Sequence, residues 1–524
     1  MNFNSSQAKI AAGLTPATGD PYASGTVKKA AWQYLLGRIL TGCVGFAYLI
    51  ILVRAMDAIP FARFITMLGY AATVGLFCGF GLDKVAARYV PEGRLFHVGA
   101  RLNHLIAVLT AIRCGVLLIA AFVTYLAWSG LEPVFFHGVH QMPPGLMVLI
   151  VGLNMFQFLT AILQALVQQK LLTQILIAQW SVRLAILAVL ISAGSRIGLA
   201  EALLISAVPE LIGAFALAAF IRSYLLRISE NVAPLAGDTT WPPRPALLKL
   251  ALHNCGYAWL VAPPQGNSMV MMSASLVAAP FVAAYGFFTG LIDRIKMYLP
   301  MMLVLNLVEP VLTAGYMKNR DFKTLAGRAV LLYKINCLMV LTLATWTAIV
   351  AEPLTSILTR GRFLEYALVL PVVLIQLALG SQNIVLQIIA NNLGRSDFLT
   401  TSGLTALVAM GLSLLFLIVM GQARYFYFLP LTYEIFNSVT IIVLLRKNGF
   451  DYPSTTAFHT WLCATSAAAY LLCAPILTTF VAPLAAVGCA AIGVGAVFLL
   501  SLYLLRPLRT AEWAILRQVV TRQR

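Results

Sequence analysis

Uncharged apolar runs of about 20 residues follow one another along most of the chain. An α-helix needs a run of this length to cross a bilayer, because each residue advances it by only about 1.5 Å. The strands of an outer-membrane barrel would instead alternate apolar and polar residues over about ten positions. The pattern therefore predicts an all-α polytopic membrane protein. We expect about fourteen transmembrane helices, at residues 33–55, 59–81, 105–128, 145–167, 172–193, 198–221, 249–274, 279–303, 329–350, 366–390, 399–421, 424–445, 459–482 and 484–505.

Composition excludes most other classes of protein. Hydrophobic residues make up 60% of the 524 and charged residues only 10%, whereas a soluble domain carries about 25% charged residues. A soluble enzyme, a coiled coil and a disordered protein are therefore excluded. All eight cysteines lie in apolar runs and none forms a CxxC pair, so we interpret them as buried hydrophobic residues rather than disulfides or metal ligands.

The positions of the basic residues predict the orientation. The chain has 36 Lys and Arg against 18 Asp and Glu. With the N-terminus placed in the cytoplasm, 24 of the 36 fall in inner loops and tails, 6 in outer loops and 6 inside predicted spans. Short cytoplasmic loops carry the excess of cations in membrane proteins. We therefore expect both termini of this multi-pass chain to be cytoplasmic.

A weak internal repeat indicates two halves. The segment AIPFARF at 58–64 opens the second span, and APFVAAY at 279–285 opens the eighth, about 220 residues later. The pair Gln157 and Gln164 of the fourth span recurs as Gln382 and Gln387 in the tenth, about 225 residues later. This lag contains six spans, an even number, so the two copies have the same topology.

We therefore expect two six-helix lobes related by a pseudo-twofold axis along the membrane normal, followed by a helix pair. The expected division is a disordered cytoplasmic tail at 1–32, an N-lobe at 33–245, a C-lobe at 246–448, and a C-terminal hairpin with a basic tail at 449–524.

The first two spans carry a series of residues typical of one family. Gly37 lies early in the first span and Arg54 near its outer end, and the pair PF at 60–61 enters the second span. The stretches GFGL at 79–82 and ARYVPE at 87–92 follow. In this order the residues resemble the polysaccharide-transporter branch of the MOP (multidrug/oligosaccharidyl-lipid/polysaccharide) flippase superfamily. The resemblance implies a lipid-linked oligosaccharide flippase of the bacterial inner membrane, with a central cavity between two lobes and alternating access.

The six cations inside predicted spans are the candidate functional residues. A charge in the bilayer is costly and usually faces a bundle interior or a wet cavity. Arg183 lies near the middle of the fifth span, where it either lines a cavity or pairs with Glu201 or Glu210 of the next span. Lys334 lies close to a span end and is expected to reach the interface. The other four are Arg38, Arg113, Arg294 and Lys296.

The densest charged cluster within a span is Asp293, Arg294 and Lys296. Asp293 and Lys296 are three residues apart and share a helix face, so they can neutralise each other. Arg294 points about 100° away from that face. The cluster is either functional, with Arg294 as an anion contact, or an ion pair that supports the helix. We favour function, because burying charges for structure alone rarely stabilises a protein.

Cations outnumber acidic residues inside the spans, which predicts an anionic substrate. Arginine suits phosphate in particular, through its bidentate fork. The candidate substrate contacts are Arg38, Arg113, Arg183, Arg294 and Lys296. The candidate coupling or gating residues are Asp293 and Glu210, together with Asn254, Gln265 and Asn267 of the seventh span, whose polar and proline residues predict a broken helix beside a cavity.

The sequence thus predicts a flippase that moves an anionic, polyprenyl diphosphate-linked oligosaccharide outward for cell-surface polysaccharide export. The expected partners are this substrate, membrane lipids, and a polysaccharide polymerase with its export machinery. No nucleic acid, metal or cofactor is expected, and no enzyme motif such as a Walker loop is present.

Two other classes of function stay open at this point. A multidrug/cation antiporter of the same superfamily would need a carboxylate-rich cavity. A membrane-embedded polymerase or glycosyltransferase usually needs a sizeable outer loop with catalytic residues, and the longest one here covers only about 129–144.

Overall fold

The computed structural model of the chain is all-helical. It describes residues 24–96, 100–229, 244–299, 301, 316, 321–477, 482–508 and 512–513. Within these residues there are 18 α-helices, two 3₁₀ helices and no strand. Residues 1–23 of the expected tail lie outside the described part, and α2 (Ser24–Ala55) begins before the expected boundary at 33.

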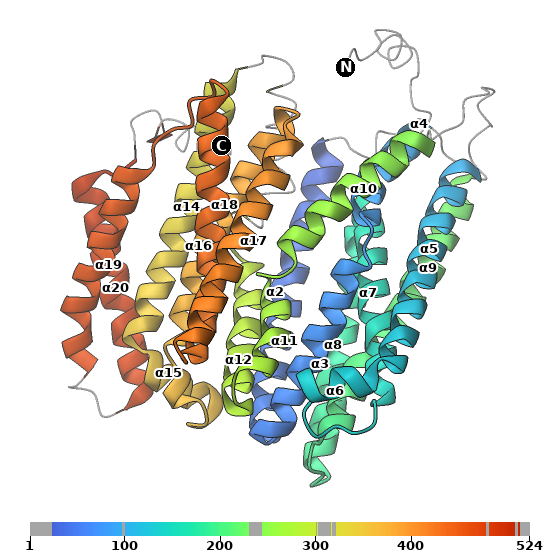
Figure 1. The fold of residues 1–524 in the computed structure, drawn as a ribbon, viewed down its shortest axis with the longest axis horizontal. Helices are drawn as coiled ribbons and strands as arrows, with labels where there is room; N and C mark the ends of the chain where they lie inside the picture. Colours follow the sequence, from blue (N-terminus) through green and yellow to red (C-terminus); the bar gives the residue numbers. More distant parts are fainter. Residues whose placement is uncertain are drawn as a thin grey trace.

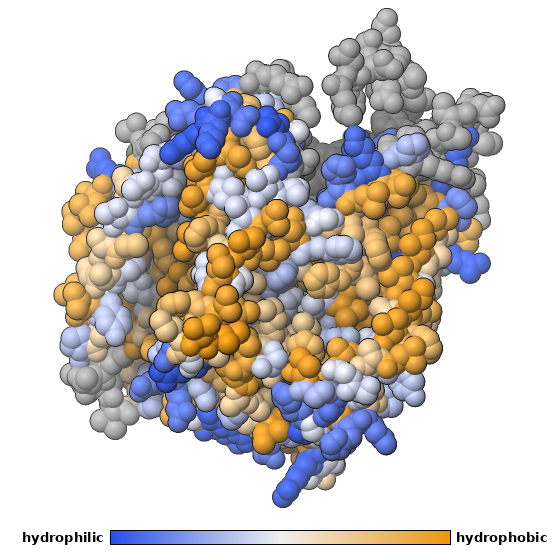
Figure 2. All heavy atoms as spheres, in the orientation of Figure 1, coloured by the Kyte–Doolittle hydropathy of each residue, from blue (hydrophilic) through white to orange (hydrophobic). Residues whose placement is uncertain are grey.

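In the described part of the chain, eleven helices are long and apolar enough to cross a membrane. Figure 2 shows apolar residues covering the middle of the visible face, with hydrophilic residues gathered toward its two ends. The eleven helices are α3 (Ala58–Phe77), α5 (Ala100–Leu126), α7 (Pro144–Ala165), α8 (Gln169–Ser192), α9 (Leu199–Ser229), α14 (Phe322–Ile349), α16 (Val369–Asn392), α17 (Ser396–Val419), α18 (Leu429–Lys447), α19 (Thr456–Leu477) and α20 (Pro483–Leu505).

The other three expected spans are present in less regular form. The first is α2, with a shorter apolar segment at Ile39–Ala55. The seventh is broken at residues 262–265 into α10 (Arg244–Val261) and α11 (Gly266–Leu276), and the eighth is α12 (Ala279–Lys296). Together with the eleven, these helices occupy the fourteen expected positions. The predicted fold class, an all-α polytopic membrane protein, is confirmed.

Short helices lie at both ends of the bundle (Figure 1). α6 (Trp128–Phe135) and α15 (Ala351–Thr359) lie at one end, and α4 (Leu82–Phe96) lies at the other. We call the end with α6 and α15 the outer face, because the charge distribution predicts that it is outside. The 3₁₀ helices are η1 (Leu364–Tyr366) and η2 (Ala423–Phe428).

Local sequence signals explain several helix ends. Asp321 begins α14 by accepting hydrogen bonds from the backbone N–H groups of Lys323 and Thr324, at 2.9 and 3.3 Å. A further hydrogen bond from the Thr324 hydroxyl lowers the pKa of this exposed carboxyl. Proline opens α7, α12, α18 and α20, where its missing N–H removes no helical hydrogen bond.

Equivalent helices pack in equivalent pairs in the two halves. In the first half α2 packs on α8, α7 on α9, and α5 on α7. In the second half the helices six spans later do the same, with α10 on α17, α16 on α18, and α14 on α16. The pair α19–α20 packs beside α14, at one edge of the bundle (Figure 1). The packing of the helices thus repeats at a spacing of six spans.

The halves meet closely along α3, which packs on both α11 and α12. A Cβ at Gly69 of α3 would lie 2.6 Å from the backbone oxygen of Asn267, and one at Gly286 of α12 would lie 2.0 Å from Ile65. Glycine is therefore required at both positions. Thr73 and Ser268 add a hydrogen bond of 3.1 Å across the same seam.

Candidate functional site

The candidate site lies where α2 and α8 of the first half meet α12 of the second. Trp180 of α8 is at its centre. The guanidinium of Arg183 lies 4.6 Å from the centre of one Trp180 ring, and that of Arg294 on α12 lies at 5.2 Å. Tyr48 of α2 packs edge-on against the indole at 5.7 Å. We call Tyr48, Trp180, Arg183, Glu210 and Arg294 the arginine–tryptophan cluster.

Helix geometry and one glycine bring this cluster together. Trp180 and Arg183 are three residues apart on α8 and so share one face. Gly45 of α2 faces them, and a Cβ there would lie 3.3 Å from Nε of Arg294 and 3.6 Å from Trp180. The absence of a side chain at Gly45 therefore lets an arginine from the second half reach the indole, where cation–π contact stabilises it.

Arg183 is neutralised within the first half. Its Nη2 lies 2.6 Å from one carboxylate oxygen of Glu210, and Gln179 donates to the other oxygen at 2.8 Å. Arg183 also donates to the backbone oxygen of Ser206 at 3.3 Å. Arg183 and Glu210 are both buried. Of the two sequence-derived alternatives for Arg183, the structure thus shows the pair with Glu210.

Arg294 differs from Arg183 in having no ion pair among the described residues. Its Nη1 donates to the backbone oxygen of Gly290 at 2.6 Å, and its Nε is buried without a hydrogen-bond partner. Within the described residues no carboxylate lies in ion-pair distance of its guanidinium. A guanidinium with buried, unused N–H groups is costly unless something binds it. Arg294 is therefore the cation of the cluster that is available to an anionic ligand.

Asp293 and Lys296 do not neutralise each other directly. Asp293 is exposed and Lys296 is partly buried, and no ion pair joins them within 4.0 Å in the described part of the chain. Lys296 lies within electrostatic reach of Asp293 on its own helix and also of Glu434 on α18. The three charged residues at the end of α12 therefore have different neighbours.

Arg113 of α5 lies outside the cluster, and its guanidinium reaches the C-terminal end of α3. It is buried and donates to the backbone oxygen of Gly75 at 3.0 Å, while its Nε and Nη1 have no partner. A cation at a helix C-terminus is stabilised by the helix dipole, so Arg113 supports the last turn of α3. Arg38 is part of α2, but its side chain lies outside the described residues.

Of the three amide residues of the seventh span, Gln265 and Asn267 lie at its break, and Asn254 lies further back within α10. Asn254 of α10 donates to the backbone of its own helix, at Leu250 O. Gln265 is exposed and precedes the first residue of α11, and Asn267 contributes its backbone oxygen to the close contact with Gly69. Gln265 and Asn267 form the turn and the seam there, and no contact in the described part of the chain joins any of the three amides to the arginine–tryptophan cluster.

Lys334 differs from its expectation. It is buried and forms an ion pair of 2.7 Å with Glu512, near the C-terminus. Its ammonium also lies 5.5 Å from the Phe458 ring. The expectation that Lys334 reaches the interface is wrong, because a carboxylate from the tail comes to it instead.

Sequence reasoning missed the aromatic part of the cluster. Trp180 and Tyr48 were not predicted, and neither was the hydroxyl of Ser206, which lies 3.2 Å from Tyr48 Oη. The available signal was the three-residue spacing between Trp180 and Arg183, which places an aromatic ring beside a buried cation.

A pair of arginines joins the two halves at the outer face. Arg54, at the end of α2, donates to the backbone oxygens of Leu358 (3.0 Å) and Ile357, at the end of α15. Arg362 donates to the backbone oxygens of Val53 (3.0 Å) and Met56, at the end of α2. Each arginine thus satisfies the C-terminal carbonyls of the other half's helix. We call Arg54 and Arg362 the outer latch.

The double variant Arg54→Ala, Arg362→Ala is expected to open the outer face. Hydrogen bonds to charged groups contribute about 1.5–3 kcal/mol each, so losing both arginines shifts the balance between closed and open forms by about tenfold or more. Distances between spin labels at positions 59 and 364 measure this shift. Arg424→Ala is the matched control, because in the described part of the chain this outer-loop arginine contacts a neighbouring ring, Tyr425, and no group of the other half. An unchanged distance distribution in the double variant would contradict the latch.

Comparison with solved structures shows the fold that this architecture shares. The lipid II flippase MurJ, in an inward closed conformation, aligns with a TM-score of 0.62 and 10% sequence identity, over 89% of this chain and 97% of that one. The eukaryotic MATE transporter AtDTX14 aligns at 0.56 and 13%, over 80% and 95%. The MATE multidrug transporter DinF-BH aligns at 0.54 and 15%, over 83% and 98%.

No protein-family model and no curated protein sequence matches the chain. At these low identities the structural likeness shows the fold alone. The chain thus has the fold that MurJ and these MATE transporters share.

Proposed function

We propose that this chain is a flippase for an anionic, lipid-linked oligosaccharide and that Arg294 binds the diphosphate of the substrate. The observation that carries the proposal is the different state of the two central arginines. Both arginines have a buried Nε without a hydrogen-bond partner, but Arg183 is neutralised by Glu210, whereas Arg294 has, among the described residues, no carboxylate in ion-pair distance. The cluster therefore has a net positive charge, which suits a phosphate group.

The position of the cluster fits transport by alternating access. Its residues come from both halves, so a relative rotation of the halves moves Arg294 away from Trp180. The outer latch joins the two halves at the outer face, and α3 packs closely on α11. We propose the lobes at 33–245 and 246–448 as the moving bodies, with the headgroup entering from the cytoplasmic leaflet of a bacterial inner membrane and both termini on that side.

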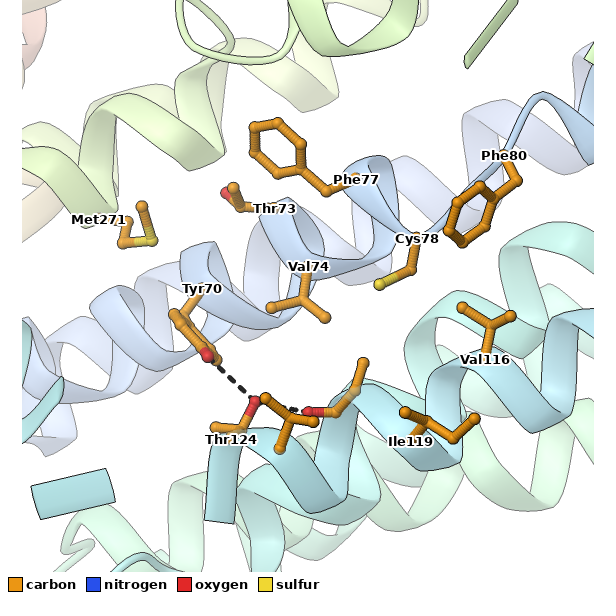
Figure 3. Close-up of a pocket in the computed structure, with 12 residues that line it drawn as sticks. Tyr70, Thr73, Val74, Phe77, Cys78, Phe80, Val116, Ile119, Thr124 and Met271 are labelled. Atoms are coloured by element: carbon orange, nitrogen blue, oxygen red, sulfur yellow. Dashed lines mark hydrogen bonds between the residues drawn. The ribbon is translucent and has the colours of Figure 1, made fainter. Parts of the chain in front are cut away.

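An apolar groove offers a path for the lipid part of the substrate. It has a volume of about 490 Å³ and is lined by α3, α5 and Met271 of α11 (Figure 3). Figure 3 shows Tyr70 pointing to Thr124, to which it is hydrogen-bonded at 3.0 Å, while Phe77 and Ile119 contribute hydrocarbon. A hydrocarbon chain can lie in this groove, at the seam of the halves, while the headgroup occupies the arginine–tryptophan cluster.

A multidrug/cation antiporter is the second candidate, because MATE transporters share the fold. Such a protein needs a free carboxylate in its central site. Here the central carboxylate, Glu210, accepts hydrogen bonds from Arg183 and Gln179 on its two oxygens. The site is therefore better suited to an anion than to a cationic drug.

The two functions are separated by transport assays with the purified protein in vesicles. A polyprenyl diphosphate-linked oligosaccharide and a cationic dye are offered to the same vesicles. We expect the lipid-linked sugar to cross the vesicle membrane and the dye to stay on the side to which it is added. Uptake of the dye without movement of the lipid-linked sugar would overturn the proposal.

A further inference from the structure

Trp180 is the group of the first half that holds the side chain of Arg294. The guanidinium lies 5.2 Å from the centre of one Trp180 ring. Within the described residues its one hydrogen bond is to Gly290, on its own helix α12. The indole therefore attaches the side chain of Arg294 to the first half. The available cation of the cluster is thus oriented by a residue outside its own half.

The first half alone fixes the orientation of this indole. Tyr48 of α2 packs edge-on against it at 5.7 Å, with an angle of 66° between the ring planes. Tyr48 is held in turn by Ser206, at 3.2 Å between the two hydroxyl oxygens. Arg183 lies 4.6 Å from the centre of one ring, and the ion pair with Glu210 sets its position. The ring therefore offers Arg294 a platform of fixed orientation.

Contact with a ring leaves the hydrogen-bonding groups of a guanidinium free. The ring attracts the charge of the guanidinium and can stack on its flat face, whereas phosphate is bound by the N–H groups at its edge. In Arg294 the buried Nε has no partner in the described part of the chain. An arginine held in this way loses side-chain freedom before a ligand arrives, and such pre-organisation strengthens binding. The ring contact and phosphate binding can therefore occur together.

Gly45 of α2 allows the ring contact to form. A Cβ at this position would lie 3.3 Å from Nε of Arg294 and 3.6 Å from Trp180. The first of these distances is too short for an unstrained contact, so a methyl group there would displace the arginine. Gly45→Ala therefore disturbs the contact between Arg294 and Trp180 without removing either side chain.

We propose that Trp180 is a positioning residue for the anion, acting through Arg294, and that it makes the affinity for the diphosphate depend on contact between the two halves. This inference rests on the proposed function, because it concerns the same anion site. With the halves in contact, the ring orients Arg294 and the site binds the diphosphate tightly. When the halves rotate apart, Arg294 loses the ring and the affinity falls, which favours release of the headgroup.

Equilibrium binding to the purified full-length protein in nanodiscs tests the role of the ring. Polyprenyl diphosphate and the uncharged polyprenyl alcohol are compared, and the readout is the ratio of the two affinities. A general loss of packing weakens the binding of both lipids alike and leaves this ratio unchanged. We expect Trp180→Leu to lower the ratio by about 2- to 30-fold, the range that corresponds to one cation–π contact. Trp180→Phe keeps an aromatic ring and is expected to retain part of the preference.

Trp259→Leu is the matched control for the loss of a tryptophan between the halves. Trp259 of α10 donates its indole N–H to the backbone oxygen of Phe77 in the first half, at 2.9 Å. In the part of the chain that the structure describes, no cation lies over its ring. We expect this variant to keep the wild-type ratio. A loss as large as that of Trp180→Leu would assign the effect to packing between the halves and overturn the proposal.

The dependence on contact between the halves is tested with the outer-latch variant Arg54→Ala, Arg362→Ala. This variant loosens the halves at the outer face and leaves every residue of the cluster in place. We expect it to lower the ratio in protein that carries Trp180, and to have little further effect when combined with Trp180→Leu. An equal effect in both proteins, or none in either, overturns the proposed dependence.

The outcomes separate this inference from the proposed function. A wild-type protein that binds diphosphate and alcohol equally contradicts the proposed function itself. A wild-type preference that Trp180→Leu leaves unchanged or raises overturns the role of Trp180 alone, and the flippase proposal stands. If Trp180→Leu does not fold, Gly45→Ala takes its place with the same expected loss. An unchanged ratio in Gly45→Ala then overturns the inference.

Discussion

Replacing Arg294 by alanine is expected to reduce export of the lipid-linked oligosaccharide by about 10- to 150-fold, because hydrogen bonds to charged groups contribute about 1.5–3 kcal/mol. The guanidinium is held by Trp180 and by the backbone of Gly290, and its buried Nε has no partner among the described residues. Removing it leaves the cluster without an available cation. Initial rates of sugar-lipid movement in reconstituted vesicles measure the effect.

Arg294→Lys separates charge from geometry. A lysine keeps the positive charge but loses the planar fork that binds phosphate through two parallel hydrogen bonds. We expect activity between those of the wild type and Arg294→Ala, with all three proteins inserted and folded alike. Wild-type rates in correctly folded Arg294→Ala would remove Arg294 from the substrate site.

Replacing Arg183 by alanine is expected to act on stability rather than on substrate binding. The change leaves Glu210 buried without its cation, and breaking a buried ion pair costs about 3–5 kcal/mol. Thermal unfolding of the purified protein in detergent measures the loss. Arg183→Ala therefore lowers the amount of folded protein, whereas Arg294→Ala lowers the rate per folded molecule.

A double variant checks this explanation. Arg183→Leu combined with Glu210→Leu removes both charges, and replacing a buried pair by apolar residues is often neutral. We expect the double variant to recover most of the stability that Arg183→Leu loses alone. Strictly additive losses would mean that the two charges do not interact, and this would contradict the ion pair of 2.6 Å.

The sequence predicted the helices well, because their signal is local. Apolar runs of membrane length located the fourteen spans, and Pro263 with Pro264 located the break in the seventh. The start of α2 was less well predicted, since the polar residues before its apolar segment continue the helix back to Ser24. The length of an apolar run shows where the chain can cross the membrane. The helix itself can extend beyond that run into the interface.

The candidate site was predicted only in part, because its contacts join residues that are distant in sequence. The cost of a charge in the bilayer identified Arg183 and Arg294, but not which of them is neutralised. That distinction depends on Glu210, in the next span, and on the approach of α12 to α8 across Gly45. The outer latch was missed for the same reason, since nothing local in the sequence brings Arg54 to the end of α15 or Arg362 to the end of α2.

The most direct test of the anion site is equilibrium binding to the purified protein in nanodiscs. Three lipids with the same polyprenyl chain are compared: the diphosphate, the monophosphate and the uncharged alcohol. We expect the wild-type protein to bind the diphosphate most tightly and the alcohol least, and Arg294→Ala to bind all three alike. Equal affinity of the wild-type protein for the diphosphate and the alcohol would contradict the account.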